Sequence, residues 1–172
     1  PASSGLLLIR GSRQIGKSTW LEQQILTSCR TLGPASTFYL NGDYISSGEE
    51  LERQILELLP LYAPRTDGFA PRLFIDEITS ITGWQTILKR LYDAGETRPL
   101  LIITTGSQAN DLRRGIERLP GRKGRLDRTE YFFPPLSYGE FKQEAATHFG
   151  KDCLHAYLLT GGAPLAANEL AQ

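Results

Sequence analysis

The residues of this sequence whose types and spacing could do chemistry begin with one glycine-containing segment near the N-terminus. It fits the pattern GxxxxGK[ST], in which glycines let successive backbone N–H groups turn toward phosphate oxygens. Lys17 is expected to reach the β- and γ-phosphates of a nucleotide, and the Ser18 hydroxyl to take one coordination site on Mg²⁺. The predicted nucleotide-binding residues of this segment are Gly11, Ser12, Arg13, Gln14, Ile15, Gly16, Lys17, Ser18 and Thr19.

The surroundings of this segment favour a functional interpretation. An apolar run at residues 6–9 precedes it, which is typical of a strand buried on both faces of a parallel sheet. Apolar residues at helical spacing follow it, and the N-terminal end of a helix adds positive potential at a phosphate site. The alternative is a glycine turn with an incidental lysine, which would not require a strand before it and a helix after it.

Two adjacent carboxylates form the second candidate group. Asp76 and Glu77 directly follow the apolar run at residues 73–75, so they are expected at the carboxyl end of a buried strand. Asp76 is predicted to hold Mg²⁺ through its waters, and Glu77 to polarise the water that attacks the γ-phosphate. The alternative is that both acids cap the next helix.

The composition narrows the classes of function. The chain has 172 residues, and 19 Lys and Arg balance 19 Asp and Glu, so no overall field attracts nucleic acid or a membrane surface. No apolar run approaches the roughly 20 residues that span a bilayer. Cys29 and Cys153 match no metal-ligand spacing and are interpreted as reduced thiols in a cytoplasmic protein. The chain begins at Pro1 and contains no methionine, which is consistent with a piece of a longer protein.

The pattern along the chain predicts an α/β protein. Apolar strands alternate with amphipathic helices, which favours a parallel sheet covered by helices on both faces, with ligand bound at the carboxyl ends of the strands. Residues 1–136 are expected to form this core and residues 137–172 a small helical region, opened by a capping box of Ser137 with Glu140. The predicted strands are residues 6–9, 37–40, 73–75, 100–104 and 131–133.

Four motifs together resemble a family of prokaryotic AAA+-type P-loop ATPases, related to archaeal ATPases and signal-transducing NTPases. The resemblance implies a three-layer α/β sandwich with strand order 5-1-4-3-2, ATP as the nucleotide, and often a further C-terminal domain. No Asn-Lys-x-Asp motif for guanine occurs in the sequence. The motifs are Arg10-Gly11-Ser12-Arg13-Gln14-Ile15-Gly16-Lys17-Ser18, Phe74-Ile75-Asp76-Glu77-Ile78, Thr105-Gly106-Ser107 and Pro135-Leu136-Ser137-Tyr138-Gly139-Glu140-Phe141.

The resemblance also assigns roles outside the loop and the acids. Thr105 and Ser107 correspond to polar residues that contact the γ-phosphate or the attacking water; the alternative is a capped turn. Arg122 or Arg125 corresponds to an arginine finger, acting in cis or on a neighbouring subunit of a homo-oligomer; the alternative is an exposed basic loop. Pro164, in the run Gly161-Gly162-Ala163-Pro164, corresponds to a turn near the adenine; an ordinary helix end is compatible with that role.

The sequence leaves three functions open. The leading one is an ATPase that moves the helical region and an attached domain. The second is a nucleotide-operated binding switch with little turnover, and the third is a small-molecule kinase. Residues 111–128 carry an excess of arginine and lysine that could contact nucleic acid, but no aromatic residue is interleaved for base stacking, so nucleotide sensing or subunit contact is favoured there.

Overall fold

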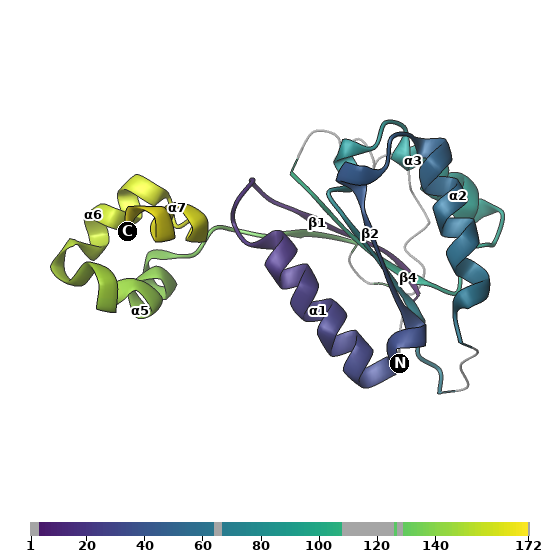
Figure 1. Ribbon diagram of the computed structural model, residues 1–172, viewed down its shortest axis with the longest axis horizontal. Helices are drawn as coiled ribbons and strands as arrows, with labels where there is room; N and C mark the ends of the chain where they lie inside the picture. The colour runs from purple at the N-terminus through teal and green to yellow at the C-terminus, as the bar shows by residue number, and fades with distance from the viewer. Residues whose placement is uncertain (1–3, 64–66, 108–125, 127–128, 172) are drawn as a thin grey trace.

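The fold is a five-stranded parallel sheet with helices on both faces, followed by a separate group of three short helices (Figure 1). The computed structural model describes residues 4–63, 67–107, 126 and 129–171. The helices are α1 (Lys17–Leu32), α2 (Gly48–Leu58), α3 (Trp84–Asp93), α5 (Tyr138–Phe149), α6 (Cys153–Thr160) and α7 (Pro164–Leu170).

The sheet has the strand order that the family resemblance predicted. Its order is β2-β3-β4-β1-β5, which is 5-1-4-3-2 read from the other edge, and all neighbouring strands are parallel. The carboxyl ends of all strands therefore lie at one edge of the sheet. The strands are β1 (Gly5–Arg10), β2 (Thr37–Asn41), β3 (Arg72–Asp76), β4 (Leu101–Gly106) and β5 (Glu130–Phe132).

The two faces of the sheet bury alternate side chains of the same strands. On β3, Leu73 and Ile75 pack into the cluster that includes Leu51 of α2 and Trp84 of α3. Phe74, between them in sequence, packs into the opposite cluster with residues of α1. Figure 1 shows α1 on one side of the sheet and α2 with α3 on the other. This is why the central strands appear in the sequence as continuous apolar runs.

The helices α5 to α7 have a small core of their own. Phe141, Cys153, Ala156 and Ala167 are buried there, and Figure 1 shows this group to one side of the sheet, beyond the loop that precedes α1. The predicted capping box is present: the Ser137 hydroxyl accepts from the Glu140 backbone N–H, and the Glu140 carboxylate accepts from the Ser137 backbone N–H. The Ser137 hydroxyl also donates to the Glu140 carboxylate at 2.7 Å, and this bond, together with the one from the Ser137 N–H, lowers the pKa of Glu140.

Short one-turn helices close the ends of β2 and β3. One spans Gly42–Tyr44 and the other Ile78–Ser80, and they lie against each other. A Cβ atom on Gly42 would lie 2.5 Å from the Glu77 carbonyl oxygen and 2.8 Å from that of Asp76. The absence of a side chain at Gly42 thus lets the end of β2 press directly on the backbone of the acid pair.

We predict that Gly42→Ala lowers the free energy of unfolding by about 1–3 kcal/mol, because the added methyl group meets backbone atoms that cannot rotate away. Gly139→Ala is the matched control. Its nearest neighbour would be the Ser137 hydroxyl at 3.9 Å, so a neutral or slightly stabilising effect is expected in helix α5. Urea unfolding of both variants is the measurement, and equal stabilities would contradict the close approach at Gly42.

Candidate functional site

The loop between β1 and α1 curls around the amino group of Lys17. Gln14 and Gly16 both have positive φ angles, 62° and 94°, which turn the backbone back on itself. Lys17 is the first residue of α1, is 4% exposed, and its Nζ donates to the Ser12 carbonyl oxygen at 2.7 Å. A Cβ on Gly11 would lie 2.5 Å from the Phe133 carbonyl oxygen, so the loop can leave the sheet here only as glycine.

The start of helix α1 is open toward the site. Its N-cap residue is Gly16, which forms no side-chain cap hydrogen bond. Ser18 and Thr19 in the first turn are exposed. The first N–H groups of a helix have no partner within the helix and carry partial positive charge, so this end is suited to hold an anion.

Asp76 and Glu77 stand at the end of β3, beside the end of β4. Asp76 is 7% exposed, and the fully buried Thr105 hydroxyl donates to its Oδ1. The Glu77 backbone N–H donates to the same Thr105 oxygen at 3.0 Å. Thr105, predicted to contact phosphate or water, is thus found bonded to both acids and does not line the cavity described below.

The Glu77 carboxylate is held at both oxygens. Oε1 lies 3.7 Å from Lys17 Nζ, and Oε2 accepts from the backbone N–H and the hydroxyl of Ser107, at 3.1 and 3.0 Å. Its backbone has a φ of 44°, a left-handed conformation that costs energy in a non-glycine residue. The strained turn after β3 thus directs the carboxylate toward the loop between β1 and α1.

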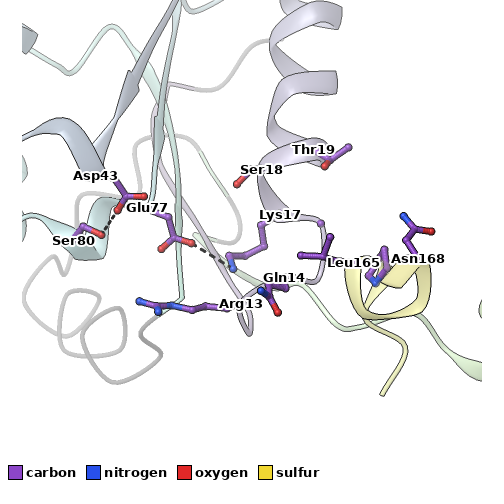
Figure 2. Close-up of a pocket in the computed structure, with 12 residues that line it drawn as sticks. Arg13, Gln14, Lys17, Ser18, Thr19, Asp43, Glu77, Ser80, Leu165 and Asn168 are labelled. Atoms are coloured by element: carbon purple, nitrogen blue, oxygen red, sulfur yellow. Dashed lines mark hydrogen bonds and ion pairs between the residues drawn. The ribbon is translucent and has the colours of Figure 1, made fainter. Parts of the chain in front are cut away.

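A cavity of about 680 Å³ joins these parts (Figure 2). That volume is within the range of sites for small ligands. Loop residues form one wall, Glu77 with the ends of β2 and β3 a second, and α7 a third. The lining residues are Arg13, Gln14, Gly16, Lys17, Ser18, Thr19, Asp43, Glu77, Ser80, Pro164, Leu165 and Asn168.

The structure brings most of the predicted site residues together, with exceptions. Pro164 reaches the cavity from the helical region, and its position near an adenine stays a prediction. Asp76 and Ser107 lie behind Glu77 and contact it without lining the cavity. Gly11, Ser12 and Ile15 form the base of the loop. Arg122 and Arg125 lie outside the described residues.

Sequence analysis missed four residues of the lining: Asp43, Ser80, Leu165 and Asn168. The Ser80 hydroxyl donates to Asp43 Oδ1 at 2.6 Å and joins the two short helices at the strand ends. Asp43 was identifiable in principle, because it follows a strand whose carboxyl end must share an edge with β3. Asn168 had no such signal, because only the packing of α7 brings it to the loop.

The residues present fit a divalent cation together with phosphate. Burial raises the pKa of Tyr39, and the negative charges of Asp76, Glu22 and Asp43 add to that effect, so carboxylates from β3, from α1 and from the turn after β2 act on the same region. Asp76, Glu77 and Ser18 offer oxygen ligands, which Mg²⁺ prefers. Among the described residues no three His, Cys, Asp or Glu side chains form a metal-binding group, so such an ion would also need phosphate or water oxygens.

A comparison with known protein families shows which family the chain belongs to. A family model described as an AAA domain matches residues 3–142, which include the loop, the acid pair and every strand of the sheet. The chain belongs to this AAA domain family. The match confirms the resemblance to AAA+-type P-loop ATPases that the sequence motifs indicated.

Solved structures of low sequence identity share the fold of this AAA domain. They include the ORC1 protein of Aeropyrum pernix in complex with DNA, 15% identical with a TM-score of 0.64, covering 97% of this chain and 53% of that chain. RuvB of Thermotoga maritima is 18% identical with a TM-score of 0.60, covering 97% and 53%. AMPPCP-bound DnaA of Aquifex aeolicus is 13% identical with a TM-score of 0.59, covering 97% and 54%. The AAA domain thus spans about half the length of these structures.

No curated protein sequence matches the chain. In the described part of the AAA domain, none of the helices is both long and apolar enough to cross a bilayer.

We predict that Thr105→Val lowers the free energy of unfolding by about 1–3 kcal/mol, because it leaves the buried Asp76 carboxylate without its hydroxyl donor. Thr104→Val is the matched control on the same strand. The Thr104 hydroxyl is equally buried but donates to the uncharged Leu7 carbonyl oxygen over a longer distance, 3.4 Å, so its loss should cost less. Urea unfolding measures both, and a larger cost for Thr104→Val would contradict the role given to Thr105.

Proposed function

We propose that this AAA domain binds ATP with Mg²⁺ and hydrolyses the bond between its β- and γ-phosphates. The observation that carries the proposal is the Glu77 carboxylate 3.7 Å from Lys17 Nζ, in a cavity that the open end of α1 also lines. A buried cation and a held carboxylate that line the same cavity can divide phosphate binding from water activation. Figure 2 shows the two side chains pointing toward each other.

The loop residues 11–19 would bind the phosphates through backbone N–H groups, with Lys17 on the β- and γ-phosphates. Ser18 and Asp76 would hold Mg²⁺, which when bound neutralises part of the phosphate charge. Glu77 would polarise the attacking water and accept its proton, as the water oxygen bonds to the γ-phosphorus and the bond to the β-phosphate oxygen breaks. The different surroundings of the two carboxylates support this division of roles: Asp76 accepts from the buried Thr105 hydroxyl, whereas the Glu77 carboxylate faces Lys17 in the cavity.

The base of the nucleotide would lie toward α7. Pro164 and Leu165 supply apolar surface to the cavity, and Asn168 supplies an amide with both donor and acceptor groups. Adenine is proposed from the family and from the fold relative DnaA, which was solved with AMPPCP, a methylene analogue of ATP. Competition of adenosine with ATP for the site would test this assignment.

The helical region is proposed to move when nucleotide binds. Residues 137–172 have a core of their own, yet α7 forms one wall of the cavity, so closure on ATP would pull this region toward residues 1–136. The chain spans about half of its fold relatives, and we propose that the motion is passed to a further domain or to another copy in a homo-oligomer. Arg122 is proposed as the arginine finger in such an arrangement. A cytoplasmic location is part of this proposal.

A binding switch with little turnover is the second candidate. Of the arginines in the described residues, only Arg13 lines the cavity, so within this part of the chain few cationic groups beside Lys17 could stabilise transition-state charge. Nucleic acid as a partner is the weaker alternative. It is supported by the ORC1 relative, whose structure contains DNA, and by the RuvB relative, described as a Holliday junction branch migration motor.

We predict magnesium-dependent phosphate release from ATP that is lost in Lys17→Ala and falls about 10²-fold or more in Glu77→Gln. Lys17→Ala should also bind ATP weakly, because it removes the buried ammonium group, whereas Glu77→Gln should keep binding. Phosphate release and calorimetric titration with ATP are the measurements.

Lys89→Ala and Glu49→Gln are the matched controls, since both residues are exposed on helices away from the cavity lining. ATP binding without turnover in the wild type would select the switch. Transfer of phosphate to an added small molecule in place of water would select a kinase. Absence of nucleotide binding would overturn the proposed function.

A further inference from the structure

Arg13 is connected through one serine side chain to Glu77, the residue proposed to activate the attacking water. The Arg13 Nε–H donates to Ser107 Oγ, at 3.5 Å, and the Ser107 hydroxyl donates to Glu77 Oε2 at 3.0 Å. The Ser107 backbone N–H donates to the same carboxylate oxygen at 3.1 Å. These contacts join a loop residue to a residue at the end of β3 through the residue that follows β4.

The chemistry of the three groups fixes the direction of these bonds. An arginine Nε–H can only donate and a carboxylate can only accept, whereas a hydroxyl does both. Ser107 accepts from Arg13 and so directs its own proton toward Glu77. A hydroxyl polarised by a cation is a stronger donor to a carboxylate, so Arg13 strengthens the bond that holds Oε2.

We infer that Arg13 is a positioning residue for Glu77 and acts through Ser107. This inference rests on the proposed function, in which Glu77 orients the attacking water. Arg13 belongs to the loop that would hold the phosphates, and its side chain is exposed and lines the cavity (Figure 2). The Arg13–Ser107–Glu77 contacts therefore couple the state of the phosphate loop to the orientation of the carboxylate.

The other oxygen of Glu77 is held differently. Lys17 lies 3.7 Å from Oε1 and also donates to the Ser12 carbonyl oxygen. Phosphate oxygens that engage Lys17 would compete with Oε1, while Ser107 and Arg13 keep hold of Oε2. Glu77 would thus remain anchored at one oxygen and present the other to water.

The test is a double-mutant cycle in ATP turnover. Arg13→Ala and Ser107→Ala are each expected to lower kcat about tenfold with a smaller change in KM, because each loosens Glu77 and leaves Lys17 in place. Since Arg13 acts through Ser107, adding Arg13→Ala to Ser107→Ala should change kcat by less than about twofold. Losses that multiply in the double variant would overturn the inference.

Two conservative variants separate charge from hydrogen bonding. Ser107→Thr keeps a hydroxyl and should restore most of the kcat that Ser107→Ala loses. Arg13→Lys keeps the positive charge but lacks the planar guanidinium group, and with it the Nε–H that donates to Ser107. This variant should therefore resemble Arg13→Ala. Arg30→Ala, an exposed arginine in the last turn of α1, is the control and should leave kcat unchanged. Full activity in Arg13→Lys would show that charge alone suffices and would overturn the inference.

A second readout does not depend on turnover. The amide proton of Ser107 donates to a carboxylate, so its NMR shift should move upfield in Glu77→Gln and, to a smaller extent, in Arg13→Ala. If the wild type fails to hydrolyse ATP but the Ser107 shift responds to Arg13→Ala, the proposed function fails while the coupling stands. No response of that shift to Arg13→Ala, with Arg30→Ala as reference, would contradict the coupling itself.

Discussion

The site depends on the parallel pairing of β1, β4 and β3. Because β4 lies between the other two, the loop after β1 and the acids after β3 are brought to the same edge of the sheet with one strand separating them. Residues in and directly after β4 fill that separation: Thr105 of β4 forms hydrogen bonds with the acid pair, and Ser107, which follows β4, holds the Glu77 carboxylate. A strand order that placed β3 further from β1 would leave Lys17 and Glu77 too far apart to face one cavity.

This arrangement is accompanied by backbone strain at Glu77. Its left-handed backbone conformation turns the chain sharply after Asp76 and aims the carboxylate at Lys17. The conformation is held from two sides: Gly42 lets the end of β2 press on the Asp76 and Glu77 carbonyl groups, and the Ser80–Asp43 bond joins the two short helices above them. Rigid support of a strained residue is typical of sites where orientation matters for function.

The helical region has a different relation to the sheet. Its core is small and is joined to the rest through the segment before α5, where the Leu136 N–H donates to the Gly162 carbonyl oxygen and Tyr157 donates to the Leu136 carbonyl oxygen. Few contacts tie it to the sheet, yet α7 lines the cavity. A wall that belongs to a weakly attached unit can change position without unfolding the core.

Local patterns determined much of this protein. The loop, the acid pair, the apolar runs of the strands and the Ser137 capping box each depend on residues close in sequence, whose backbone geometry and burial follow from their own spacing. The α2 helix shows where such patterns fail. Ser47 and Glu50 have the spacing of a capping box, and Ser47 caps the helix, but the Glu50 carboxylate accepts from Ser46, so the reciprocal bond is missing.

Tertiary structure alone decided which side chains meet across the site. The contacts of Thr105 with Asp76, of Ser107 with Glu77 and Arg13, and of Asn168 with the cavity join residues separated by long stretches of chain. Periodicity reports only whether a side chain faces inward or outward, so the sequence alone could assign Thr105 to phosphate as easily as to a carboxylate. The direction of a buried hydroxyl is set by the neighbouring strand, and that neighbour exists only in the folded protein.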